Sequence, residues 1–124
     1  MPLQAAQSPV RATAQCEEIV SRWTGAGDAS LVKAYGPGVV SCVRTAAGKY
    51  TVTFNDTTGV LLGFQGMTHT VADAFPQFWK CIFSTFNTST KVVNLECWEC
   101  DGAAALVAPT SGAPVTLRFT FGRV

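Results

Sequence analysis

The sequence predicts an all-β protein: a single-domain antiparallel β-sandwich, jelly-roll-like, with about eight strands. Short runs of alternating apolar and polar residues recur along the chain, and turn-forming residues separate them. No apolar stripe with helical spacing extends over about 11 residues. Strands at this spacing are typical of sandwiches and jelly rolls.

The length and composition indicate one globular domain. A chain of 124 residues can bury its own core, and a hydrophobic content of 48% excludes a disordered chain. Residues 1–10 are predicted to form a flexible N-terminal arm, and residues 11–124 the single β-sandwich domain. Charged residues make up only 14%, against about 25% in an average soluble domain. Small polar residues or a bound partner must therefore cover much of the surface.

The first predicted strands precede a glycine-proline turn. Residues 14–22 are the best helix candidate, but the β-branched Ile19 and Val20 favour a strand. A short strand at 31–35 ends at the Gly36-Pro37-Gly38 segment, where the chain must turn because proline restricts φ and glycine permits positive φ.

Residues 39–54, VVSCVRTAAGKYTVTF, predict a β-hairpin. Its first strand, 39–45, is rich in β-branched residues, and its second strand, 50–54, alternates between apolar and polar positions. The apolar face of the second strand consists of Tyr50, Val52 and Phe54. The connection Ala46-Ala47-Gly48 suits a type I turn closed by a bulge, with Gly48 in the left-handed conformation.

The second half of the chain predicts four further strands. They are expected at residues 60–64, 77–86, 91–100 and 115–121. A long connection is expected at 66–76, a turn at 87–90 and a loop at 102–114. Within 77–86, alternation predicts that Trp79, Cys81 and Phe83 share one face.

The sharpest chemical motif is CWEC, residues 97–100. Two cysteines at this spacing can form half of a zinc site or a redox pair, but a zinc site needs four ligands, and the chain has only one histidine. On a strand, Cys97 and Cys100 point to opposite faces. Cys16, Cys42 and Cys81 stand alone, so the thiols are predicted to be buried apolar groups, with no disulfide framework.

No other motif predicts catalysis. His69 precedes Asp73 by four residues, but a G-x-S-x-G nucleophile motif is missing, so a loop histidine is expected. The acidic pair Glu17-Glu18 faces opposite ways on a strand. The acidic group of Glu96, Glu99 and Asp101 is expected to be solvated.

Three glycine or asparagine segments are interpreted as turns. Gly25-Ala26-Gly27 is not followed by the G-K-[ST] of a phosphate-binding loop. Asn55-Asp56-Thr57 and Asn87-Thr88-Ser89 match glycosylation sequons, but with no secretory signal they indicate only polar turns. We therefore predict a protein that is not an enzyme, with no catalytic, cofactor-binding or metal-binding residues.

The aromatic residues leave two alternatives open. Core packing explains most of them, and a protein interface is the alternative for some. The candidates for an interface are Phe75, Phe78, Trp79 and Trp98. An aromatic face that binds sugars is a further alternative.

The charge pattern and the absence of long apolar runs exclude other classes of partner. The net charge is +1, and Lys and Arg occur singly, so direct nucleic-acid binding is not expected. No apolar run approaches the ~18 residues of a membrane helix, so no membrane association is expected. The first residues show no secretory-signal pattern, which predicts synthesis in a cytoplasm.

The run GPGVVSCVRTAAGKYTVTF, with the later LLGFQG and VTLRFTF, resembles small structural proteins of tailed bacteriophages. In those sequences a G-x-G-V-x-S-V-x-R-x-x-x-G-x-Y-x-V-x-F pattern recurs. The matching positions here are Gly36, Gly38, Val39, Ser41, Arg44, Gly48, Tyr50, Val52 and Phe54. Cys42 stands where valine is usual.

The resemblance implies a capsid decoration, or cement, protein. Such a protein binds the outside of the major capsid protein shell and staples neighbouring capsomers against the pressure of packaged DNA. It would be made in the host cytoplasm, act on the capsid exterior of the virion, and bind there as a homodimer. The alternative is a phage tail- or fibre-associated structural or adhesion protein with an aromatic binding face.

Overall fold

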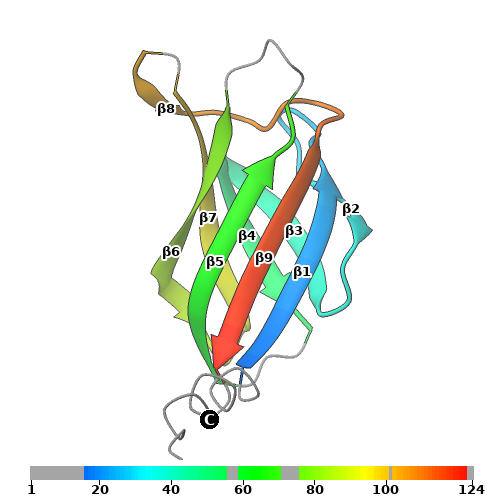
Figure 1. The fold of residues 1–124 in the computed structure, drawn as a ribbon, viewed down its shortest axis with the longest axis vertical. Coiled ribbons are helices and arrows are strands. Elements are labelled where there is room, and N and C mark those ends of the chain that lie inside the picture. The colour runs from blue at the N-terminus through cyan, green and yellow to red at the C-terminus, as the bar shows by residue number, and fades with distance from the viewer. Residues whose placement is uncertain (1–15, 56–58, 71–75, 101, 123–124) are drawn as a thin grey trace, which may run out of the picture.

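The computed structural model describes residues 16–55, 59–70, 76–100 and 102–122, which form an antiparallel β structure (Figure 1). Its strands are β1 (Cys16–Thr24), β2 (Val32–Tyr35), β3 (Val39–Ala46), β4 (Lys49–Phe54), β5 (Val60–Thr68), β6 (Gln77–Asn87), β7 (Val92–Cys100), β8 (Ala104–Leu106) and β9 (Pro114–Gly122). These residues contain no helix, and hence none long and apolar enough to cross a membrane.

The strands form one continuous sheet in the order β2-β1-β9-β5-β6-β7-β4-β3, with β8 paired to β7. The sheet bends so that β2, β1, β9 and β5 face β6, β7, β4 and β3, and it nearly closes into a barrel-like shape (Figure 1). Within the described part of the chain, two register pairs join β5 to β6: Met67 with Phe78 and Thr68 with Gln77. The predicted all-β antiparallel fold is confirmed.

At the opposite seam, β2 and β3 lie close together without a ladder of backbone hydrogen bonds. The Leu31 amide donates to the Cys42 carbonyl oxygen at 3.2 Å, and the Arg44 amide donates to Ser30 Oγ at 2.9 Å. Lys33 Nζ donates to the Val39 carbonyl oxygen at 2.8 Å. These bonds cover part of the free edge of β3, and covered edges resist unwanted strand pairing.

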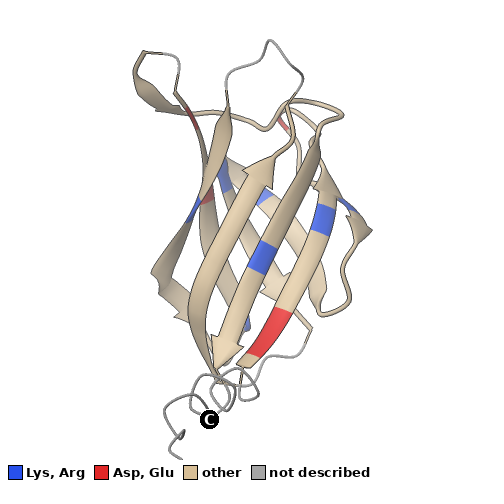
Figure 2. Cartoon of the chain, viewed as in Figure 1, with Lys and Arg blue, Asp and Glu red and all other residues tan. Residues whose placement is uncertain are grey.

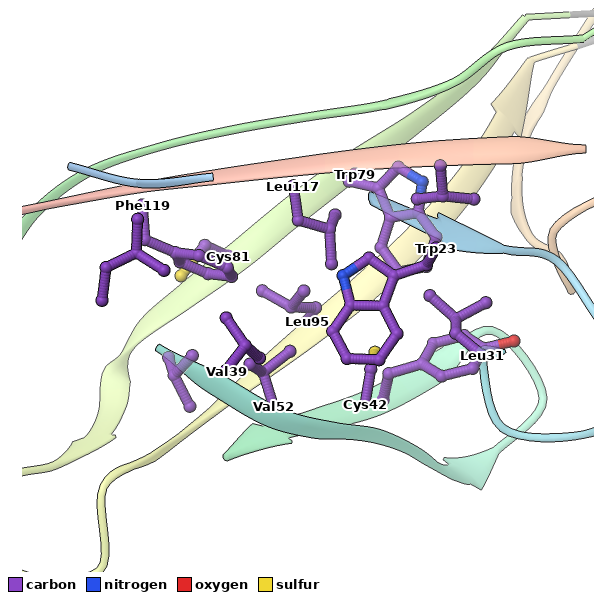
Figure 3. Packing of buried hydrophobic residues seen from close by; sticks show 14 of the residues in the cluster. Trp23, Leu31, Val39, Cys42, Val52, Trp79, Cys81, Leu95, Leu117 and Phe119 are labelled. Carbon is purple, nitrogen blue, oxygen red and sulfur yellow. The ribbon is translucent and has the colours of Figure 1, made fainter. Parts of the chain in front are cut away.

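The core lies between the two layers and takes side chains from both (Figure 3). Tyr50, Val52 and Phe54, the predicted apolar face of the hairpin, are each exposed by no more than 2%. The Phe54 ring contacts the rings of Phe119 and Phe121 edge to face, with centroids 4.9 and 5.2 Å apart. Aromatic rings favour this geometry because the positive edge of one meets the negative face of the other.

Both predicted turns of the central strands are present, but the β3–β4 turn is shorter than expected, because Ala46 belongs to β3 and pairs with Lys49. Gly48 has the expected positive φ of 71°, and the register shifts between Arg44 and Ala46, beside the turn. At residues 87–90, the Asn87 side-chain oxygen accepts the amides of Ser89 and Thr90, which stabilises the turn locally.

The structure corrects two predicted connections. Strand β5 continues to Thr68, where a connection from residue 66 was expected. The expected loop at 102–114 contains strand β8, which pairs with the end of β7. Glycine and alanine carry little strand signal of their own, and these two elements form because neighbouring strands supply hydrogen-bond partners.

The predicted shared face of Trp79, Cys81 and Phe83 is wrong for Phe83, whose side chain is 47% exposed. Ile82 pairs with Asn94 and Asn87 pairs with Val92, so residues 83–86 of β6 oppose a single residue of β7. This bulge breaks the two-residue alternation and turns Phe83 outward. The predicted arm at residues 1–10 lies outside the described residues.

Candidate functional site

Four apolar side chains occupy one register row on the outer surface. Met67 of β5 pairs with Phe78 of β6, Phe78 pairs with Trp98 of β7, and Trp98 pairs with Leu106 of β8. Directly paired residues of antiparallel strands lie on the same face, with their Cβ atoms about 5 Å apart. We call the row Met67, Phe78, Trp98 and Leu106 the apolar ladder.

The apolar ladder is accessible to a partner. Met67 is 54% exposed and Phe78 is 55% exposed, and Trp98 and Leu106 are half-buried. The Trp98 indole Nε1 donates to Glu96 Oε1 at 3.1 Å, which fixes the orientation of the ring. An aromatic ring that is already held in place loses little conformational entropy when a partner binds.

The inner face of the same strands holds the apolar ladder in register. Trp79, next to Phe78, is only 7% exposed, and its indole Nε1 donates to Thr68 Oγ1 of β5 at 2.8 Å. A Cβ atom at Gly66 would lie 2.6 Å from the Trp79 Cβ atom. Glycine at position 66 therefore lets the Trp79 side chain pack against β5, and this packing brings Met67 beside Phe78.

The β8 end of the apolar ladder is supported by the β3–β4 turn. The Cys97 amide donates to the Gly48 carbonyl oxygen at 2.8 Å, and the Val107 amide donates to the Cys97 carbonyl oxygen at 3.0 Å. A Cβ atom at Gly48 would lie 3.0 Å from the Leu106 Cβ atom. The close approach of the turn thus positions Leu106 beside Trp98.

A surface depression of about 200 Å³ adjoins the apolar ladder at Met67. It is lined by Gln65, Gly66, Met67, His69, Thr116 and Arg118. His69 Nε2 lies 3.1 Å from Thr116 Oγ1, and Arg118 Nε lies 3.8 Å from Glu18 Oε1. Of the strands around this depression, β1 and β9 carry charged residues, whereas β5 carries none (Figure 2).

A second depression, of about 250 Å³, lies at the β6 bulge on the other layer. Thr85 Oγ1 donates to the Ile82 carbonyl oxygen at 2.6 Å and accepts the Asn94 amide at 2.9 Å. The Thr85 hydroxyl thus replaces the strand hydrogen bonds that the bulge removes, which gives it a structural role.

The structure places the two CWEC cysteines on opposite faces, as the strand geometry predicts: Cys97 is fully buried and Cys100 is exposed. The prediction that the thiols are buried is therefore wrong for Cys100, and Cys16 is only partly buried. Burial raises the pKa of Cys97 to about 12, although a hydrogen bond with Thr68 lowers it in part. Burial also raises the pKa of Cys81 to about 12, and it raises the pKa of Cys42 further. These thiols are neutral at physiological pH, and neutral thiols are weak nucleophiles and metal ligands.

The other residues weighed for chemistry are dispersed. His69 is exposed, and Asp73 lies outside the described residues. Glu99 Oε2 accepts Gln77 Nε2 at 3.2 Å, and Glu96 accepts Trp98. Within the described part of the chain, no three His, Cys, Asp or Glu residues come together in a geometry that could hold a metal ion.

The four aromatic residues considered for an interface differ in location. Trp79 belongs to the core, Phe78 and Trp98 lie on the outer surface, and Phe75 falls outside the described residues. Sequence reasoning missed Met67 and Leu106, because both lie in segments that were expected to be loops. Pairing with the alternating strands β6 and β7 is the only signal that could place them.

Comparison with protein-family models, with curated proteins and with solved structures gives no match for this chain. Evidence on function therefore comes from the surface of the molecule and from the sequence pattern in residues 36–54.

Proposed function

We propose that this chain is a bacteriophage capsid decoration protein, which binds the outside of the major capsid protein shell and staples neighbouring capsomers. The observation that carries the proposal is the apolar ladder, four adjoining apolar side chains on the outer surface of the sheet. The sequence pattern over residues 36–54 supports the phage assignment.

The composition of the apolar ladder fits a protein partner. Tryptophan, phenylalanine and methionine are enriched in protein interfaces, and exposed neighbouring apolar groups gain free energy when a partner covers them. Phe78 and Trp98 are the expected anchors, because buried aromatic side chains carry much of the binding energy in such contacts. Each contact on a shell is repeated, so modest affinity per site becomes strong when a homodimer links two capsomers.

Binding of the purified chain to expanded phage heads that lack it tests the proposal. We expect Phe78→Ala to weaken binding at least tenfold, which corresponds to about 1.4 kcal/mol. Phe83→Ala is the matched control, because Phe83 lies on the same strand, is 47% exposed and is outside the apolar ladder. Equal loss in both variants would show that the apolar ladder is not the interface.

Cryo-electron microscopy of the native particle tests the placement. Density for this chain on the capsid exterior would support a decoration protein, and density only at the tail would rule it out in favour of a tail- or fibre-associated adhesion protein. The side-by-side Phe78 and Trp98 are the feature that such an adhesin would use to stack on sugars. The aliphatic ends of the apolar ladder, Met67 and Leu106, favour a protein partner over a sugar.

A further inference from the structure

The depression beside Met67 has a chemistry that the apolar ladder lacks. Its polar lining side chains are Gln65, His69, Thr116 and Arg118, all of which can donate hydrogen bonds, and none of the lining residues is acidic. Met67 belongs to both features. If a partner residue packs on Met67 and Phe78, the next residue of the partner's chain is therefore within reach of these hydrogen-bond donors.

The positive charge of Arg118 is only partly compensated. Its one ion pair within the described residues is with Glu18, at 3.8 Å from Nε, and the two side chains are 47% and 51% exposed. At that distance and exposure, the pair is weak and is screened by solvent. Arg22 adds a second positive charge, because it pairs with Thr116 in the next strand.

We propose that this surface binds a protein segment in which an apolar side chain covers Met67 and Phe78 and an adjacent carboxylate enters the depression beside Arg118. The proposal rests on the function proposed above, since it takes the apolar ladder to be a protein interface. Guanidinium groups bind carboxylates through strong charge-assisted hydrogen bonds, and Thr116 and Gln65 supply neutral donors beside Arg118.

A carboxylate fits this site better than a nucleic-acid phosphate. The chain has a net charge of +1 with scattered basic residues, whereas phosphate backbones are bound by clustered positive charge. The apolar ladder also offers no partner for a second phosphate. A protein segment with an acidic residue beside an apolar one matches both the depression and the apolar ladder.

Short capped peptides test the proposal directly on the ¹⁵N-labelled full chain by NMR titration. The probes are acetyl-Phe-Asp-amide, acetyl-Phe-Asn-amide, inorganic phosphate and an oligothymidylate. We expect the Phe-Asp peptide to shift the resonances of Met67, Phe78, Thr116 and the Arg118 Nε–H group, and to bind at least threefold more tightly than the Phe-Asn peptide. Equal binding of the two peptides would overturn the proposal, as would equal shifts at Arg118 from phosphate or oligothymidylate.

Two charge-removing variants locate the effect. Arg118→Gln should abolish the preference for the Phe-Asp peptide, and Lys80→Gln, which removes one charge outside the depression, should retain it. Thermal unfolding of both variants checks that they fold, and a preference that survives in folded Arg118→Gln would overturn the proposal.

Phage heads separate the failure of this inference from failure of the proposed function. If heads bind the wild type and Arg118→Gln equally, with the same salt dependence, the proposed binding of a carboxylate beside Arg118 is wrong and the decoration function stands. If the peptide preference is present but heads do not bind the chain, the decoration function is wrong and the carboxylate site stands.

Discussion

The inner and outer faces of the β5–β6–β7 corner are both apolar, but different interactions hold them. On the inner face, Trp79 is 7% exposed, bonds Thr68 and packs at 5.3 Å from the Tyr50 ring. On the outer face, its neighbour Phe78 is 55% exposed and pairs with Met67 and Trp98 of the apolar ladder. Folding buries the inner face, whereas the outer face stays exposed, so substitutions on the two faces should differ in their effect on stability.

The largest expected effect comes from truncating the inner tryptophan. Trp79→Ala should lower the free energy of unfolding by about 4 kcal/mol, because it leaves a cavity in the core and removes the bond to Thr68. Phe78→Ala should lower it by less than about 1 kcal/mol, because its side chain is half solvated already. Urea unfolding followed by circular dichroism measures both, and similar losses would mean that the two faces do not differ in role.

The β3–β4 turn can be tested next, because it supports the β8 end of the apolar ladder. Gly48→Val should lower the free energy of unfolding by about 3 kcal/mol, since φ is 71° and a Cβ atom would lie 2.9 Å from the Val107 amide nitrogen. Gly27→Val is the matched control, because φ is 62° and nothing lies within 4 Å of an added Cβ atom. Urea unfolding of the two variants separates backbone strain from crowding, and an equal loss would exclude crowding by β8.

The sequence predicts the β3–β4 hairpin well. Strand β4 alternates cleanly between buried and more exposed residues, and Gly48 can be assigned because a tight hairpin connection requires a left-handed residue. The buried face of Tyr50, Val52 and Phe54 follows from the same alternation. In this region each local preference agrees with the final fold, so local reasoning suffices.

The apolar ladder could be predicted only in part. Phe78 and Trp98 were recognisable as interface candidates, but Met67 lies beyond Gly66 in a segment with little strand propensity. Leu106 lies in an alanine-rich segment whose strand forms because β7 extends past the end of β4 and needs a partner. The pairing register of these strands depends on contacts between residues that are distant in sequence. The alternation of apolar and polar residues also does not predict the bulge that exposes Phe83.

Two glycines of β5 differ in how closely they approach the core. A Cβ atom at Gly66 would lie 2.6 Å from Trp79 Cβ on the inner side, whereas at Gly63 the nearest atom, Thr120 Cβ, would lie at 3.7 Å. Gly66→Ala should lower the free energy of unfolding by about 2 kcal/mol, and Gly63→Ala should change it by less than about 0.5 kcal/mol. Thermal and urea unfolding measure both, and a neutral Gly66→Ala would mean that Trp79 does not hold β5 in place.

The smallest expected effect concerns the pH dependence of the buried thiols. Burial raises the folded-state pKa of Cys42, Cys81 and Cys97 above the ordinary value of 9.0, to about 12 for the last two. Between these values the unfolded chain releases protons that the folded chain keeps, so the free energy of unfolding falls as pH rises. Each thiol should contribute about 1.4 kcal/mol per pH unit above pH 9 and nothing well below it.

Replacing one thiol isolates its share of this slope. Cys97→Val keeps an apolar side chain in the core, and it should reduce the slope between pH 9 and 10 by about one third, because two of the three thiols remain. The window stops at pH 10 because Tyr50, whose pKa burial raises from 10.0 to about 12, titrates above it. Exposed Cys100 provides the control: Cys100→Ala removes a thiol that lies outside the core and should leave the slope unchanged. Urea unfolding at stepped pH measures all three proteins, and an unchanged slope in Cys97→Val would show that the inner face is open to solvent at the β7 position next to Trp98.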